Sequence, residues 1–265
     1  MILYIFLSHD VDWRKQGPEK EHIFARKDRF ENSIFERVYQ ENLYYNFEEI
    51  MDLEEKFNIR STFFFRTYYE NGNYLDYEEE ITSLIKGKWE IGLHTDGNSI
   101  RNLDLIQKEK TNLEILTKKA IVGNRVHYLN FDDKLLSKLN QIGFIYDSTM
   151  KKYKNYISID DMNYKKIDGI IEFPITIMDT YLFSYLGVTE ENILNIFEET
   201  ISTAMCKNES DIKIITLLWH DNVLKMKGGR MYKNILEFLT SQNNIKIMRG
   251  IDLVNIINKF DKNLK

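Results

Sequence analysis

The sequence predicts a parallel α/β fold. Short apolar segments that are typical of β-strands alternate along the chain with longer amphipathic segments that are typical of helices. Segment 61–65 is apolar over most of its length, as expected for a strand that helices cover on both faces. No change in composition marks a boundary, so residues 1–265 are expected to form a single domain.

Each expected strand is a run rich in β-branched, aliphatic or aromatic residues. The first is the apolar run at 2–8, and the second is the phenylalanine-rich run at 61–66. The others follow the same pattern at 89–94, 120–126, 144–147, 170–177, 212–220 and 245–248. Because helical patterns separate most of these runs, parallel pairing is expected.

Each expected helix places its apolar residues at helical spacing, so that they share one face. The expected helices are 47–57, with Phe47, Ile50, Met51, Leu53 and Phe57; 102–116, with Leu103, Ile106, Leu113 and Leu116; 133–142, with Leu135, Leu136, Leu139 and Ile142; 189–205, with Ile193, Leu194, Ile196, Phe197, Ile201 and Met205; and 251–260. The charged region after Asp12, at about 13–40, is expected to be a long loop beside a binding pocket.

Composition argues against several classes of protein. With 36 basic and 41 acidic residues the net charge is −5, which does not indicate a nucleic-acid partner or an acidic membrane surface. The single cysteine, Cys206, allows no internal disulfide and no multi-cysteine metal site. No apolar run approaches the ~18 residues of a membrane span, and the first is too short for a secretory signal. We therefore expect a soluble, cytoplasmic protein.

The most informative motif is Ser8-His9-Asp10-Val11-Asp12, which follows the first apolar run. Side chains alternate between the two faces of a strand, so Asp10 and Asp12 are expected on the same face. Two carboxylates held close together are costly unless a cation or a proton lies between them. The motif therefore predicts a metal site or an acid/base pair, although aspartates also occur at strand ends for structural reasons.

Other expected strands also end in polar groups. They are followed by or include His94-Thr95-Asp96, Arg125-Val126-His127-Tyr128, Asp147-Ser148-Thr149, Asp179 and His220-Asp221-Asn222. In a parallel α/β fold these strand ends meet on one rim, where ligands bind. Carboxylate oxygen and imidazole nitrogen suit zinc or a similar divalent ion. Together the residues indicate a metal-dependent hydrolase.

The order of these motifs resembles the polysaccharide deacetylase superfamily, carbohydrate esterase family four. The resemblance rests on the aspartate-rich strand end, Gly92-Leu93-His94-Thr95, Arg125-x-x-Tyr128, Asp147-Ser148 and Leu218-Trp219-His220, and it reaches to about residue 222. Within it the chain looks like a variant branch associated with surface-glycan biosynthesis. The resemblance implies a distorted (β/α) barrel of seven to eight mostly parallel strands.

The resemblance also implies a divalent metal, most simply zinc, and specific roles for the acidic and histidine residues. Asp10 matches the general base and Asp12 matches a metal ligand, although Val11 between them leaves an exchange of the two roles open. His94 matches the first metal-binding histidine. Asn98 stands where the family has a second histidine, so either Asn98 or His127 is expected to complete the metal site.

Three further residues acquire catalytic roles from the resemblance. Arg125 matches the arginine that orients the base, Asp147 matches the aspartate of the fourth motif, and His220 matches the histidine that protonates the leaving group. The implied activity is removal of an N-acetyl or O-acetyl group from a sugar. The alternatives are a hydrolase of another non-peptide C–N amide and a catalytically inactive glycan-binding barrel.

Overall fold

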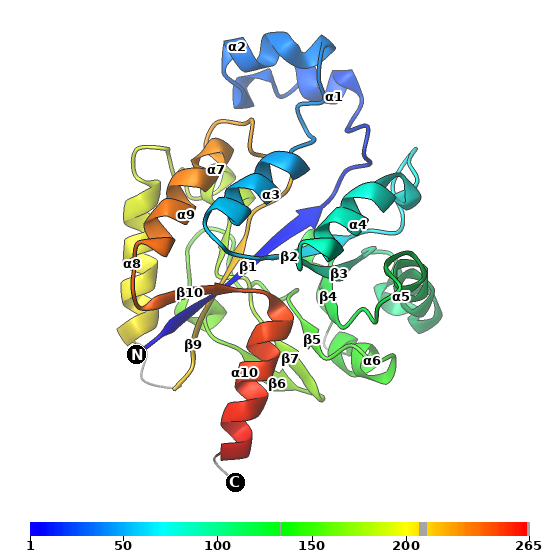
Figure 1. Cartoon of the computed structure of the whole chain (residues 1–265), viewed down its shortest axis with the longest axis vertical. Helices are drawn as coiled ribbons and strands as arrows, with labels where there is room; N and C mark the ends of the chain where they lie inside the picture. The colour runs from blue at the N-terminus through cyan, green and yellow to red at the C-terminus, as the bar shows by residue number, and fades with distance from the viewer. Residues whose placement is uncertain (133, 207–210, 264–265) are drawn as a thin grey trace.

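The computed structural model describes residues 1–132, 134–206 and 211–263, which fold around one curled β-sheet (Figure 1). The described residues form ten strands: β1 (Leu3–Val11), β2 (Thr62–Phe65), β3 (Glu90–Thr95), β4 (Gly123–Val126), β5 (Tyr146–Asp147), β6 (Lys165–Ile167), β7 (Ile170–Glu172), β8 (Ile177–Met178), β9 (Lys213–Leu218) and β10 (Ile245–Met248). Their order is β6-β7-β5-β4-β3-β2-β1-β9-β8, with β10 beside β1. Among these strands, only the β6–β7 pair is antiparallel.

The chain segment that carries β7 and β8 runs from one side of this sheet to the other. β7 pairs with β5, and β8, which follows a few residues later, pairs with β9. Pro174 lies between them and has no N–H to give to a ladder, so the strand expected at 170–177 is divided in two. The expected distorted barrel of mostly parallel strands is confirmed. The split strand and the antiparallel β6 account for the additional strands.

Helices surround the sheet (Figure 1). They are α1 (Lys20–Phe24), α2 (Asn32–Phe35), α3 (Phe47–Lys56), α4 (Glu78–Lys86), α5 (Leu103–Thr117), α6 (Leu135–Gln141), α7 (Asp179–Ser184), α8 (Ile193–Cys206), α9 (Tyr232–Thr240) and α10 (Gly250–Asn263). α3, α5, α6, α8 and α10 confirm the five expected helices within a few residues; Asp133, at the start of one of them, lies outside the described residues. α4, α7 and α9 were not anticipated.

The side chains of strand β1 alternate between the barrel interior and the outer helices. Phe6, Ser8 and Asp10 point inward, as their contacts with interior groups show. His9 points outward, where Nδ1 donates to the Trp219 carbonyl (2.5 Å) and Nε2 lies 2.8 Å from Glu54 Oε1. The period of two therefore places the aspartates of the motif inside the barrel and uses the histidine for packing.

Aromatic residues fill the barrel interior below these aspartates. Phe6, Phe64, Tyr146 and Phe173 contact one another edge to face, with ring centroids 5.2–6.5 Å apart. The cluster continues into α10 through Leu253, Val254 and Ile257. This apolar plug leaves the opposite, carboxyl-terminal end of the barrel as the polar end.

We expect Gly123→Ala to destabilise the fold by about 1–3 kcal/mol through overpacking. A Cβ on Gly123 would lie 2.1 Å from Cζ of the buried Tyr146 ring. Urea unfolding measures the loss. In a Tyr146→Leu background the same substitution is expected to cost less, because the ring that it meets is gone. An unchanged cost in that background would contradict the overpacking explanation.

The segment between β1 and α3 is not an open loop. It contains α1, α2 and two short 3₁₀ turns, and lies at the end of the molecule toward which the β1 arrow points (Figure 1). It has its own small core of Ile23, Phe30, Val38, Leu43 and Tyr44, joined by Met226. The segment expected at about 13–40 as a loop is therefore a helical cap beside the polar end of the barrel.

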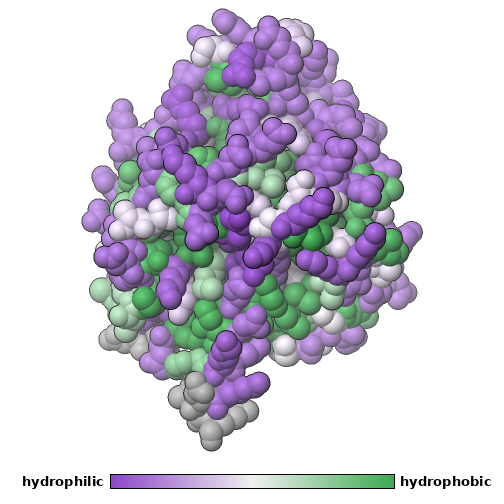
Figure 2. All heavy atoms as spheres, in the orientation of Figure 1, coloured by the Kyte–Doolittle hydropathy of each residue, from purple (hydrophilic) through white to green (hydrophobic). Residues whose placement is uncertain are grey.

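The surface of this cap is mostly hydrophilic, whereas hydrophobic patches are more frequent in the lower half of the same face (Figure 2). Within the described residues, no helix combines the length and the apolar character that a bilayer span requires.

Candidate active site

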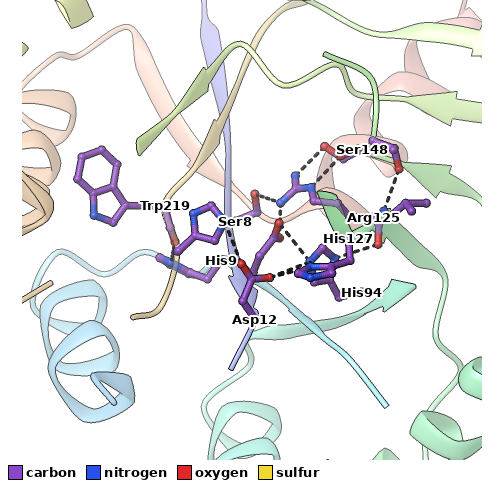
Figure 3. Close-up of polar contacts among 12 residues, drawn as sticks. Ser8, His9, Asp12, His94, Arg125, His127, Ser148 and Trp219 are labelled. Atoms are coloured by element: carbon purple, nitrogen blue, oxygen red, sulfur yellow. Dashed lines mark hydrogen bonds and ion pairs between the residues drawn. The ribbon is translucent and has the colours of Figure 1, made fainter. Parts of the chain in front are cut away.

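Asp12, His94 and His127 converge at the carboxyl end of the barrel (Figure 3). Asp12 Oδ1 lies 3.1 Å from His94 Nε2 and 3.1 Å from His127 Nδ1, and the two nitrogens are 3.2 Å apart. The three donor atoms thus form a nearly equilateral triangle. A tetrahedral ion bound at ordinary zinc distances holds its donors about 3.3 Å apart, so the triangle has the size of one coordination face.

The protonation of these groups also fits a cation. His94 Nδ1 lies 3.0 Å from the Arg125 carbonyl oxygen, which can only accept, so Nδ1 carries the proton. Nε2, the ring nitrogen that does not face this carbonyl, therefore faces Asp12 and His127. Burial lowers the pKa of His127, which favours its neutral form. The outer hydrogen bond of His94 is the kind that orients metal-bound histidines.

The Asp12 carboxylate is ionised. Burial disfavours its charge, but hydrogen bonds from His127 and His94 and the positive charge of His220 hold the pKa of Asp12 well below its usual range. A half-buried carboxylate beside two imidazole nitrogens is a suitable donor set for a divalent ion. Asp12, His94 and His127 could therefore hold a metal.

A second group surrounds Asp10. Arg125 Nη1 donates to Asp10 Oδ1 (2.8 Å) and to Ser8 Oγ (2.9 Å), while Nη2 donates to Ser148 Oγ (2.7 Å) (Figure 3). The guanidinium also lies 4.5 Å from the centre of the Phe64 ring, directly above the aromatic plug. Asp10 Oδ2 is 3.7 Å from His94 Nε2. Arg125 therefore fixes Asp10 beside the three donor atoms without contacting them through its guanidinium.

His220 approaches Asp12 from another strand end. Its Nδ1 lies 2.7 Å from Asp179 Oδ1, and its backbone N–H donates to Asp179 Oδ2 (2.6 Å). Nε2 is 3.5 Å from Asp12 Oδ2. Although burial disfavours the imidazolium, the carboxylates of Asp179, Asp12 and Asp10 raise the pKa of His220 to about 10. His220 therefore carries a proton at neutral pH.

The structure thus brings together six of the seven site residues predicted from the sequence: Asp10, Asp12, His94, Arg125, His127 and His220. Asp147 lies one strand further along the sheet. In the described part of the chain, Asp147 accepts hydrogen bonds from the Asn124 side chain (2.6 Å) and from Thr149.

Two further residues bear on the predicted roles. Asn98 lines the cavity over the site, and its backbone N–H donates to Asp96 Oδ1. Asp179, the partner of His220, was assigned no role from the sequence. The sequence signal that could have identified Asp179 is its position just after the expected strand 170–177.

A cavity of about 350 Å³ opens over this group. Asp12 and His127 lie in its wall, and the rest of the wall comes from the beginning of the cap, the chain after β2, the segment after β3 and the turn after β4. Trp13, Tyr68 and Tyr128 contribute aromatic rings to the same wall. The cavity is large enough for one sugar-sized ligand and is built from several strand ends.

Comparisons with known proteins identify related folds. No protein-family model and no curated protein sequence matches the chain. A candidate polysaccharide deacetylase from Mycobacterium smegmatis has a TM-score of 0.67 and 18% identity, covering 98% of this chain and 91% of its own. A probable polysaccharide deacetylase from Pseudomonas aeruginosa PAO1 has a TM-score of 0.67 and 12% identity, covering 96% of this chain and 90% of its own. PuuE allantoinase has a TM-score of 0.66 and 12% identity, covering 96% of this chain and 89% of its own.

TM-scores of 0.66–0.67 over nearly complete chains establish a shared fold, although only 12–18% of the residues are identical. The chain therefore has the distorted barrel fold of these polysaccharide deacetylases and of PuuE allantoinase.

Proposed function

We propose that this protein is a zinc-dependent deacetylase that hydrolyses an N-acetyl group, or an O-acetyl group, on a sugar. The observation that carries the proposal is the Asp12–His94–His127 triangle, with a carboxylate held by an arginine on one side and a protonated histidine on the other. The shared fold with polysaccharide deacetylases supports it.

In this proposal Asp12, His94 and His127 hold the metal, and His127 takes the place considered for Asn98. When bound, a divalent ion polarises an acyl carbonyl and lowers the pKa of a water molecule toward ~7. Asp10 serves as the general base that accepts the proton of the attacking water. The ion pair with Arg125 fixes the direction of the Asp10 carboxylate, so that the arginine acts as a positioning residue.

His220 serves as the general acid. An amine leaves as a neutral group only after it is protonated, and Nε2 of His220 is the nitrogen not occupied by Asp179. The raised pKa of about 10 keeps this proton available at neutral pH. Asp179 holds the ring through Nδ1, and the acid and base thus approach the proposed metal from different strand ends.

For Asp147 we propose a positioning role instead of direct contact with substrate. Thr149 Oγ1 donates to Asp147 Oδ1 (3.0 Å) and accepts from the Val126 backbone N–H (3.0 Å). Val126 immediately precedes His127. Asp147 therefore supports the end of β4, from which a proposed metal ligand emerges.

The activity test measures acetate release from N-acetylated and O-acetylated sugars by purified protein supplied with zinc. We expect release that stops on chelation and returns on addition of zinc. Asp12→Ala is expected to lower kcat/KM by at least about 10²-fold because it removes a ligand, while the exposed Lys86→Ala control retains activity. Release that persists with a chelator would contradict the proposal.

A second candidate is hydrolysis of another non-peptide amide, since an allantoinase has the same fold. The residues that surround the reacting carbonyl would be the same, and only the leaving group would differ. Release of ammonia or ring opening of a cyclic amide, without acetate release from any sugar, would favour this candidate.

A further inference from the structure

A buried polar cluster on the outer face of β1 takes no part in the chemistry proposed above. It consists of His9, Glu54, Trp89 and Tyr232, which come from four separate parts of the chain. Glu54 Oε1 lies 2.8 Å from His9 Nε2 and accepts a hydrogen bond from the Tyr232 hydroxyl (2.8 Å), while Oε2 accepts from Trp89 Nε1 (2.6 Å). The surrounding elements therefore hold this carboxylate in one position.

Glu54 is an unusual residue at its place in α3. It lies on the buried face of the helix with Phe47 and Ile50, and it is fully buried. An apolar side chain there would avoid the cost of removing a carboxylate from water. Because apolar replacement of a buried polar network is often neutral or stabilising, stability alone does not account for Glu54. Its contacts indicate another role, which is to hold the imidazole ring of His9 in one orientation.

The second nitrogen of His9 reaches the peptide unit that joins Trp219 to His220. Nδ1 donates to the Trp219 carbonyl oxygen (2.5 Å). The N–H of the same peptide unit belongs to His220 and donates to Asp179 Oδ2 (2.6 Å). His9 therefore holds this peptide unit at its oxygen, and Asp179 holds it at its nitrogen.

These contacts form a continuous chain of hydrogen bonds from α3 to the proposed general acid. The chain runs from Glu54 through the His9 ring and the peptide unit to Asp179, and Asp179 Oδ1 lies 2.7 Å from His220 Nδ1. Hydrogen bonds in such a chain polarise one another, so a donor on the carbonyl strengthens the N–H as a donor to Asp179. The contact made by His9 thus bears on both the main chain and the ring partner of His220.

We propose that His9, held by Glu54, is a positioning residue for the general acid His220. It fixes the peptide unit that carries the His220 side chain and thereby the direction of the ring. This inference rests on the proposed function, because an acid is needed only where a leaving group must be protonated. One face of β1 then supplies the general base, Asp10, and the other face supports the acid.

The kinetic test compares kcat for an N-acetylated sugar with kcat for phenyl acetate, whose leaving group needs little protonation. His9→Leu removes both hydrogen bonds of the ring and is expected to lower kcat for the amide by about 10–10²-fold, the effect of a misplaced catalytic group. It is expected to lower kcat for the ester much less. His9→Asn, whose side-chain N–H can replace Nδ1 as a donor, is expected to recover most of the amide activity.

A second variant background shows whether His9 acts through His220. In His220→Ala, the further substitution His9→Leu is expected to cost no additional amide activity, because the group that it positions is absent. If His9→Leu fails to fold, Glu54→Gln makes the same test, since it keeps the shape of the side chain and removes the charge beside Nε2. A smaller loss of kcat, confined to the amide, is then expected.

Phe63→Leu is the matched control for disturbed packing. The Phe63 ring is fully buried and lies 4.6 Å from the His9 ring between centroids, and its side chain has no hydrogen-bonding group. This variant is expected to lower the free energy of unfolding without changing the ratio of amide to ester kcat. Equal losses on amide and ester in His9→Leu, or an undiminished effect of His9→Leu in the His220→Ala background, would overturn the inference.

A measurement without turnover separates this inference from the proposed function. In protein labelled with ¹⁵N-histidine, NMR detects the His220 backbone N–H, which is assigned by its absence in His220→Ala. His9→Leu is expected to speed exchange of this proton with solvent by about tenfold, the effect of one weakened hydrogen bond, whereas Phe63→Leu is not. Faster exchange supports the inference even if no acetate is released, which would contradict only the proposed deacetylation. Unchanged exchange in His9→Leu would overturn the inference.

Discussion

His220→Ala is expected to lower kcat for acetate release from an N-acetylated sugar by about 10²–10⁴-fold, the usual contribution of a general acid. The loss follows from the leaving group, because an amine is expelled slowly unless it is protonated. His220 is the group positioned to do this, with Nδ1 on Asp179 and Nε2 near Asp12. Steady-state kinetics at saturating zinc measure the change, and circular dichroism verifies the fold.

The leaving group offers a control for this assignment. An acetyl ester of a phenol expels a stable anion and needs little proton donation, so His220→Ala is expected to affect its hydrolysis much less than that of the amide. Equal losses on the amide and on the activated ester would argue against a proton-donor role for His220.

The contact between Asp179 and His220 leads to a separate prediction about the pH dependence of kcat. The Asp179 carboxylate is the main charge that raises the pKa of His220 to about 10, so Asp179→Asn is expected to lower that pKa. The alkaline fall of kcat, which reports loss of the acid's proton, is then expected at lower pH in the variant. Profiles of kcat against pH for the two enzymes measure the shift. An alkaline limb at the same pH in both would contradict the role of Asp179.

Arg125→Met is expected to destabilise the protein by about 3–5 kcal/mol, because it leaves Asp10 as a buried carboxylate without its partner. Arg125 is fully buried and donates hydrogen bonds to Asp10, to Ser8 and to the backbone carbonyl and hydroxyl of Ser148. Urea unfolding gives the change in the free energy of unfolding. Activity is expected to fall as well, since Asp10 loses the group that fixes the direction of its carboxylate.

A double-mutant cycle tests the cause of that loss. In the Arg125→Met background, Asp10→Asn removes the unpaired charge and is expected to recover part of the stability. If the two substitutions destabilise additively, the ion pair is not the source of the cost.

Much of the site could be predicted because its residues follow strand ends. The alternation of side chains along β1 places Asp10 inside the barrel, and parallel pairing brings His94, Arg125 and His220 to the same end. These rules depend on local periodicity and on the direction of strands, both of which the sequence carries. The expected proximity of the acidic residues and histidines follows from them.

Other features depend on how the chain bends in three dimensions. Pro174 divides one expected strand, and the part after it carries Asp179 to His220, whereas Asp147 stays beside Asn124 and Thr149. The sequence shows both aspartates at strand ends but does not show which of the two reaches His220. The cap was likewise expected as a loop, because its short helices lack long amphipathic repeats and are held by a local core.

The central claim is that Asp12, His94 and His127 bind one divalent ion. Metal content of purified protein after zinc supplementation and desalting, measured by mass spectrometry, tests it most directly. We predict one zinc per chain in the wild type and in Asn98→Ala, and loss of zinc in Asp12→Ala, His94→Ala and His127→Ala. A wild-type protein without bound metal, or full zinc content in His127→Ala, would contradict the account.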